Sequence, residues 1–232
     1  MMVQERYLGV LTGEVGSGKS TLIRKLFRSL DALKYQTIYI CIAGLKPRDF
    51  YSEVLKHLGE DPQFFVDKAK RLWEDILETR QAQGDKQLVI VIDEAQDLIP
   101  AMIQELRFVM SQNMDSASLI TMILVGQPEL RKTLRMKKHE AIAQRVGMQY
   151  HLSGMNKEET FAYIRHQMKV TETQSPVFSE SAMQLIYSSS QGIARVVNHI
   201  CTQALFEAHS KGLEVVEESL IGRILADHEK PR

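Results

Sequence analysis

The sequence has few cysteines, and none of them stands in a ligand pattern. Cys41 and Cys201 are the only two, and no histidine shares metal-ligand spacing with either. Each lies inside an apolar stretch, where an unpaired cysteine usually packs as a small hydrophobic residue. We therefore expect two buried, reduced thiols, as in a cytoplasmic protein, and neither a disulfide nor a metal site.

The chain also lacks net charge and long hydrophobic runs. Lys plus Arg and Asp plus Glu number 29 each, which excludes a polybasic tail binder and an acidic solvating chain but leaves room for a local basic patch. The longest aliphatic run, residues 88–92, is far shorter than the roughly 20 residues that span a bilayer. The first residues show no export signal pattern. We expect a cytoplasmic protein without a membrane segment.

Short apolar runs alternate with helical periodicity over the first two thirds of the chain. The runs that predict strands are residues 8–12, 37–42, 87–92 and 119–125. The stretches whose apolar spacing predicts helices are residues 19–33, 48–58, 64–83 and 101–110. This alternation predicts a parallel sheet with right-handed crossovers, hence a three-layer α/β fold.

Strand signals stop after about residue 151. The stretches that then predict helices are residues 156–169, 179–189, 194–208 and 217–226. Asn156 followed by Glu159 predicts a capping box, and Ser179 predicts a second N-cap. We expect two domains, an α/β nucleotide-binding domain at 1–151 and a small all-helical domain at 152–232.

A phosphate-binding motif lies between the first predicted strand and the first predicted helix. The segment GEVGSGKST fits G-x-x-x-x-G-K-[ST], in which glycines let backbone N–H groups surround phosphates at a helix N-terminus. Lys19 is predicted to bridge the β- and γ-phosphates, and the Ser20 hydroxyl to bind Mg²⁺. The predicted nucleotide-binding residues are Gly13, Glu14, Val15, Gly16, Ser17, Gly18, Lys19, Ser20 and Thr21.

Two carboxylates follow the apolar run at residues 87–92. Asp93 and Glu94 stand where a central strand ends, the arrangement of a Walker B motif. Asp93 is expected to hold Mg²⁺ through water, and Glu94 to polarise the attacking water. Such a pair alone could equally cap the next helix, but together with the P-loop it predicts ATP hydrolysis, with ATP and Mg²⁺ bound.

Phosphoryl transfer also needs cations that balance charge developing on the γ-phosphate. Arg145 precedes a further predicted strand at 146–151, and Arg195 opens a helix after Gly192. By position alone, either arginine could be a solvated surface charge. A basic cluster, which could be a solvated face, a subunit interface or a DNA-facing surface, consists of Arg131, Lys132, Arg135, Lys137, Lys138 and Arg145.

Several motifs taken together resemble one family. GEVGSGKST, VIDEAQDL, ILVGQPELR, the Gln144-Arg145 step and GIARVVNHIC occur in an order that is similar to the ExeA/GspA-type AAA+ ATPases. Short members of this family accompany transposases, whereas longer members energise assembly of the type II secretion apparatus. The phrase FSESAMQLIYSSSQGIARVVN resembles the lid of the transposon-linked members. The resemblance implies a P-loop AAA+ parallel-sheet domain followed by a helical lid.

The resemblance also implies residue roles. Arg145 falls on the arginine-finger position that reaches the neighbouring subunit's γ-phosphate, which implies a homo-oligomer with shared active sites. Arg195 falls on sensor 2 of the lid, and Gln127 on sensor 1, with a turn residue before Pro128 as the alternative. Lys46 and Arg48 follow the second strand, in the region that faces DNA in related transposition ATPases. Phosphate contacts of this kind are independent of sequence and sensitive to salt.

The function that the resemblance implies is that of an ATP-hydrolysing transposition helper. Such a protein binds double-stranded DNA and recruits or licenses a transposase. Two alternatives stay open: a cytoplasmic ATPase module of type II secretion assembly, and an origin-recognition or helicase-loading ATPase.

Overall fold

A computed structural model of the chain describes residues 8–110, 120–170 and 177–228. The chain divides into two compact units, each with its own hydrophobic core. The first unit comprises Met1–Gly13 and Lys19–His151, and the second comprises Glu14–Gly18 and Leu152–Arg232. The five-residue segment Glu14–Gly18 thus groups with the C-terminal helices rather than with the sheet that it follows in sequence.

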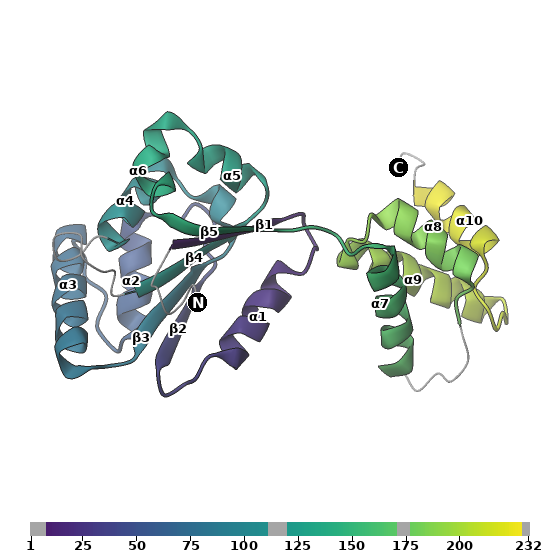
Figure 1. The fold of residues 1–232 in the computed structure, drawn as a ribbon, viewed down its shortest axis with the longest axis horizontal. Helices are drawn as coiled ribbons and strands as arrows, with labels where there is room; N and C mark the ends of the chain where they lie inside the picture. Colours follow the sequence, from purple (N-terminus) through teal and green to yellow (C-terminus); the bar gives the residue numbers. More distant parts are fainter. Residues whose placement is uncertain (1–7, 111–119, 171–176, 229–232) are drawn as a thin grey trace. The chain divides into compact units, whose positions relative to one another are not determined.

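A five-stranded sheet in the order β2-β3-β4-β1-β5 forms the centre of the first unit (Figure 1). The strands are β1 Leu8–Gly13, β2 Tyr35–Ile40, β3 Gln87–Ile92, β4 Ile120–Gly126 and β5 Val146–Leu152. The pairs β2–β3, β3–β4 and β1–β4 are parallel. Because β3 and β4 are interior strands covered on both faces, both are apolar almost throughout.

Helices cover the two faces of this sheet, which confirms the predicted three-layer α/β fold. One face carries α1 Lys19–Ser29, and the other carries α2 Pro47–His57, α3 Val66–Gln83 and α4 Pro100–Met110 (Figure 1). Trp73, Phe50 and Tyr51 are the largest fully buried side chains of this core. Two short helices that the sequence did not predict, α5 Glu129–Leu134 and α6 Glu140–Ala143, follow β4.

The predicted strand at 119–125 is present as β4, although Leu119 lies outside the described residues. Among its described residues the unit also has two 3₁₀ turns, η1 Ala95–Asp97 and η2 Lys137–His139. The basic cluster is therefore distributed over α5, η2 and the turn before β5 rather than lying on one helix face.

The predicted burial of both cysteines is wrong for Cys41, which is exposed, and correct for Cys201 in α9. Cys41 follows β2, an edge strand in which Ile40 is buried but its neighbour Tyr39 is exposed. An edge strand is covered less completely than an interior one, so an apolar run in it does not ensure burial. Both thiols are free.

The second unit is helical. Its helices are α7 Lys157–Val170, α8 Glu180–Ser190, α9 Ala194–Ser210 and α10 Glu218–His228. The capping box before α7 is confirmed: the Asn156 N–H donates to Glu159 Oε2 at 2.9 Å, and the Glu159 N–H donates to Asn156 Oδ1 at 2.8 Å. The predicted Ser179 cap is also confirmed, since its Oγ accepts from the Ala182 N–H at 3.2 Å. No helix in the described ranges is long and apolar enough to cross a membrane.

Candidate active site

The P-loop joins β1 to α1 and has the backbone shape that surrounds phosphate. Gly16 and Gly18 have φ angles of 83° and 103°, in the left-handed region that glycine enters without steric cost. The Ser17 N–H donates to the Glu14 carbonyl at 3.1 Å, which tightens the turn. The Ser17 Oγ is buried and has no hydrogen-bond partner within the described part of the chain. A loop with this shape and an unsatisfied hydroxyl fits a phosphate group.

Lys19 and Ser20 open α1 directly after the loop. Lys19 is buried, and its Nζ donates a 2.8 Å hydrogen bond to the Gly13 carbonyl. Ser20 and Thr21 are exposed in the first turn, where the helix dipole favours negative charge. The ammonium and the helix start are therefore held beside the loop by local structure alone.

Asp93 directly follows the buried strand β3 and is itself only 4% exposed. Its Oδ1 accepts from the Glu94 N–H at 2.8 Å, and its Oδ2 accepts from the Tyr39 hydroxyl. Partial desolvation of its hydroxyl first, and this bond second, raise the pKa of Tyr39 above its ordinary value. Sequence reasoning missed Tyr39 because the register of β2 against β3, which pairs Tyr39 with Val91, is what brings it to Asp93.

Glu94 has an unusual backbone conformation. Its φ of 52° lies in the left-handed region, which costs a non-glycine residue about 1–2 kcal/mol. Its exposed carboxylate accepts a 2.8 Å hydrogen bond at Oε2 from the Gln96 side-chain amide. Backbone strain of this kind is concentrated at functional sites, so it marks Glu94 as a candidate catalytic residue.

Gln127 follows β4, the strand next to β3. Its backbone N–H donates to Gln96 Oε1 at 3.0 Å. The parallel register, which pairs Ile92 with Leu124, brings the carboxyl ends of β3 and β4 to one edge of the sheet. The structure therefore connects Glu94 to Gln127 through Gln96, a residue that sequence reasoning did not single out.

Asp93 and Ser20 offer the donors that suit Mg²⁺. This ion prefers hard oxygen ligands and is usually held by one or two protein groups together with phosphates and water. No cluster of three or more His, Cys, Asp or Glu side chains in the described ranges could hold a metal without such help. A carboxylate and a hydroxyl are oxygen donors of the kind that fit the ion in its nucleotide-bound form.

Arg145 lies at the other end of the sheet. It is half-buried between α6 and β5, and its N–H donates to the Ile142 carbonyl at 3.0 Å. Thr12 Oγ1 of β1 is 3.1 Å from His151 Nδ1 of β5, so the carboxyl ends of these two strands meet. Arg145 precedes β5 and is thus roughly 20 Å along the strand from that edge, at about 3.3 Å per residue. The fold separates Arg145 from the edge that carries Asp93 and Glu94.

Arg195 is the second residue of α9 and is exposed. Its backbone N–H donates to the Gly16 carbonyl at 3.2 Å. Both residues belong to the second compact unit. The predicted sensor residue therefore lies directly against the P-loop.

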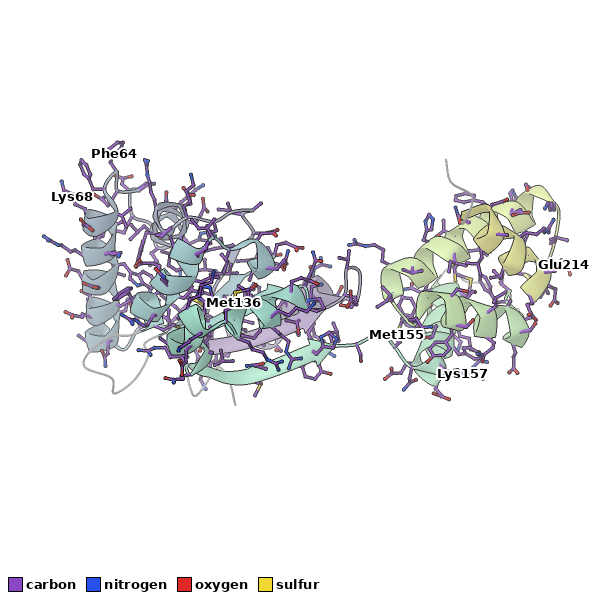
Figure 2. All side chains as sticks on the ribbon, turned by 90° about the horizontal axis from the view of Figure 1, so that it is seen from above. Phe64, Lys68, Met136, Met155, Lys157 and Glu214 are labelled. Carbon is purple, nitrogen blue, oxygen red and sulfur yellow. The ribbon has the colours of Figure 1, made fainter. Side chains whose placement is uncertain are left out.

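Lys46 and Arg48 are exposed where α2 begins, after β2. The Arg48 guanidinium lies 4.9 Å from the centre of the Phe64 ring, an attractive cation–π distance. Phe64 is 70% exposed and lies just before α3, at the same end of the helix as Lys68 (Figure 2). Lys46 and Arg48 are thus both accessible, and Arg48 lies against an aromatic ring that sequence reasoning did not mention.

A family model described as "AAA domain" matches residues 2–134 of the chain. The chain belongs to the AAA domain family. This AAA protein is also 34% identical over 205 residues to General secretion pathway protein A of Aeromonas hydrophila, a match that covers 88% of the chain. It spans only 37% of that relative's length. The resemblance to ExeA/GspA-like AAA+ ATPases is confirmed at this level.

Solved structures with the same fold include the Aeropyrum pernix ORC1 protein in complex with DNA, at a TM-score of 0.66, 16% identity and coverage of 96% of this chain and 60% of that one. The A. pernix ORC2 protein in its ADPNP-ADP complexes has a TM-score of 0.64, 16% identity and coverage of 95% and 62%. The RuvB Holliday junction branch migration motor of Thermotoga maritima has a TM-score of 0.62, 16% identity and coverage of 94% and 60%. At these identities the likeness shows the fold alone, and it confirms the predicted P-loop AAA+ fold.

Proposed function

We propose that this AAA protein binds ATP with Mg²⁺ and hydrolyses it to ADP and phosphate. The observation that carries the proposal is the combination of a P-loop that has glycines at positive φ with a buried strand that ends in Asp93 and the strained Glu94. In the family to which the chain belongs, these elements bind and hydrolyse nucleotide. In this proposal the chain consists of a nucleotide-binding domain at 1–151 and a helical lid domain at 152–232.

Each residue then has a separate task. Backbone N–H groups of the loop and the Lys19 ammonium bind the phosphates, while Ser20 and Asp93 hold the ion that neutralises charge developing on the phosphoryl group. Glu94 accepts the proton of the attacking water. Gln127 and Arg195 position the γ-phosphate from the end of β4 and from the lid.

Arg145 acts in a neighbouring subunit of a homo-oligomer. Its distance of roughly 20 Å from the carboxyl edge of its own sheet, at about 3.3 Å per strand residue, exceeds the reach of an arginine side chain. A residue so placed is suited to a γ-phosphate bound by another copy of the chain. Two subunits would thus complete each active site.

We further propose that the protein is a cytoplasmic, DNA-binding transposition helper that recruits or licenses a transposase. The exposed Lys46 and Arg48 support contact with double-stranded DNA through phosphates. The segment FSESAMQLIYSSSQGIARVVN resembles the lid sequence of transposon-linked members. A second candidate, an ATPase module of type II secretion assembly, is favoured by the 34% identity to General secretion pathway protein A. The likeness to ORC proteins shows fold alone and adds no support to an origin-recognition role.

The deciding experiment measures ATPase activity with and without double-stranded DNA at low and at physiological salt. Double-stranded DNA is expected to stimulate ATP hydrolysis. The affinity for DNA should fall steeply between about 50 and 200 mM salt, because phosphate contacts release counterions. Lys46→Ala with Arg48→Ala should weaken binding to all sequences about equally. The matched control, Arg24→Ala with Lys25→Ala on α1, also removes two exposed positive charges and should bind nearly as the parent. A parent that hydrolyses ATP but binds no DNA at low salt would favour the secretion role.

Two variants test the ATPase assignment itself. Lys19→Ala should lose tight ATP binding in a fluorescent-nucleotide titration, because it removes the ammonium from the phosphates. Glu94→Gln should bind ATP but hydrolyse it slowly, since an amide does not accept the proton of water. Unchanged hydrolysis by Glu94→Gln would place the catalytic base elsewhere.

A further inference from the structure

The side-chain amide of Gln96 joins two parts of the candidate site. Its Nε2 donates to Glu94 Oε2 at 2.8 Å, and its Oε1 accepts from the Gln127 backbone N–H at 3.0 Å. Nε2 also lies 3.3 Å from Asp97 Oδ2, a longer hydrogen bond. One planar group thus reaches from the carboxylate after β3 to the backbone at the end of β4, across 31 residues of sequence.

The backbone around Gln96 leaves space for this bridge and holds it in place. A Cβ on Gly126 would lie 2.7 Å from Gln96 Oε1, so a larger residue there would displace the amide. The turn η1 holds Gln96 close to Glu94, through the Asp97 N–H that donates to the Glu94 carbonyl at 3.0 Å. The neighbouring Ala95 is buried, which anchors the turn against the core.

The chemistry of the bridge suits glutamine in particular. A carboxylate needs a donor and a backbone N–H needs an acceptor, and an amide side chain carries both on one planar group. Glutamate at this position would keep the acceptor but turn a second negative oxygen toward Glu94. A general base must lie within hydrogen-bond reach of its water, so the orientation of its carboxylate matters directly.

We propose that Gln96 is a positioning residue that holds the Glu94 carboxylate in its hydrolytic orientation and connects it to the end of β4 at Gln127. The inference rests on the proposed function, in which Glu94 is the catalytic base. It adds that a displacement of the Gln127 backbone, which would accompany contact with the γ-phosphate, changes the orientation of Glu94 through one amide group.

Gln96→Met tests the role, because it keeps a side chain of similar length and removes the hydrogen bonds to Glu94, Gln127 and Asp97. It should lower kcat by about 10- to 100-fold, the loss that displacement of a reacting group by about 1 Å produces. The KM and the ATP dissociation constant should stay within about twofold of the parent, since Gln96 contacts neither the P-loop nor Lys19 in the hydrogen bonds above. Gln96→Glu should lower kcat at least as much as Gln96→Met does. Gln83→Met, on the exposed end of α3, is the control and should match the parent.

A second variant moves the amide without altering it. Gly126→Ala should lower kcat to a similar extent in the parent, because the new methyl group displaces Gln96 Oε1. In the Gln96→Met background the same change should lower kcat much less, since the hydrogen bonds that it disturbs are already absent. Equal costs in both backgrounds would show that Gly126 acts through another contact and would count against the bridge. Thermal melting of all four proteins tests whether each is folded.

A third measurement does not depend on hydrolysis. The side-chain amide of Gln96, assigned in a ¹⁵N-resolved NMR spectrum by its absence in Gln96→Met, should shift in Glu94→Gln. An amide signal that is insensitive to Glu94 would overturn the contact itself.

The outcomes separate the inference from the proposed function. A parent that hydrolyses ATP and a Gln96→Met variant with the same or higher kcat overturn the positioning role alone. If the variant loses ATP affinity by the same factor as kcat, Gln96 supports nucleotide binding, and the positioning role is overturned as well. A parent without hydrolysis, even with double-stranded DNA, overturns the proposed function, and the positioning role with it.

Discussion

The backbone N–H of Arg195 donates a 3.2 Å hydrogen bond to the carbonyl oxygen of Gly16. Arg195 belongs to the first turn of α9, whereas Gly16 lies in the P-loop. The approach is so close that a Cβ built on Gly16 would lie 2.4 Å from the Arg195 Cβ. The glycine is thus required twice, once for its positive φ and once for the space that α9 occupies.

Gly16→Ala should therefore be more disruptive than strain alone explains. The left-handed conformation costs alanine about 1–2 kcal/mol, and the collision with Arg195 adds to that cost. We expect the free energy of unfolding, measured with urea, to fall by more than this conformational cost. ATP binding, measured by fluorescent-nucleotide titration, should also be lost.

Gly84→Ala is the matched control. Gly84 has a φ of 68° at the end of α3, and a Cβ there would meet nothing within 4 Å. In this variant the free energy of unfolding should fall by about 1–2 kcal/mol, and the ATP affinity should equal that of the parent. If Gly16→Ala costs no more than Gly84→Ala, the contact between α9 and the loop has no energetic weight.

Mixing two inactive variants tests whether Arg145 acts on a neighbouring subunit. Arg145→Ala should bind ATP almost normally but hydrolyse it very slowly, since fingers of this kind contribute about 10³–10⁵ in rate. Lys19→Ala keeps the arginine and fails to hold nucleotide. Their mixture forms some interfaces with an intact P-loop facing an intact Arg145, so partial ATPase activity that rises with protein concentration is expected. No recovery despite demonstrated co-assembly would show that Arg145 does not act in trans.

A buried hydroxyl should make the protein less stable in alkali. The Tyr51 hydroxyl donates to Glu105 Oε1 at 2.8 Å, and Lys70 Nζ lies 2.9 Å from the same oxygen. Burial first, and the bond to Glu105 second, raise the pKa of Tyr51 above its ordinary value. The folded state then holds this proton more tightly than the unfolded state, so the stabilisation is complete below about pH 10 and is lost as the pH rises further.

Tyr51→Phe removes both the hydrogen bond and the titrating group. The free energy of unfolding at about pH 8 should fall by about 1–2 kcal/mol, because the buried Glu105 loses a donor. Between about pH 10 and 11 the variant should lose less stability than the parent. Tyr150→Phe, at an exposed position on β5, should change neither quantity. If Tyr51→Phe loses as much stability as the parent between about pH 10 and 11, groups other than Tyr51 cause the loss.

Cys41 should react slowly for an exposed thiol. Partial burial first, and then the nearby Asp93 and Glu94 carboxylates, raise the pKa of Cys41, while burial raises that of Cys201 to about 12. Because the thiolate is the nucleophile, iodoacetamide should modify Cys41 alone in the folded protein, more slowly at pH 8 than a free thiol. The rate should still increase above about pH 9, and Asp93→Asn should raise it at pH 8. Mass spectrometry after digestion measures both sites, and modification of Cys201 at a similar rate would contradict its burial.

Local spacing was enough to predict most of the elements. A fully apolar run at 87–92 identified an interior strand, and Asn156 with Glu159 identified the start of α7, because these patterns are recorded within a few consecutive residues. The short helices α5 and α6 were missed, since a helix of six residues or fewer carries too little periodicity to stand out. Cys41 was misjudged because an apolar run does not reveal whether its strand lies inside the sheet or at its edge.

The sequence by itself determined the chemistry that is available. It provides a glycine loop before Lys19, two carboxylates after a buried strand, and, further along the chain, Arg145 and Arg195. Tertiary structure alone decided which groups meet. The Tyr39 hydroxyl reaches Asp93 across 54 residues, and Gln96 reaches Gln127 across 31. These contacts depend on strand order and register, which place β2 and β4 on either side of β3. The physical reason is that hydrogen bonding between parallel strands sets neighbours that no spacing along the chain encodes.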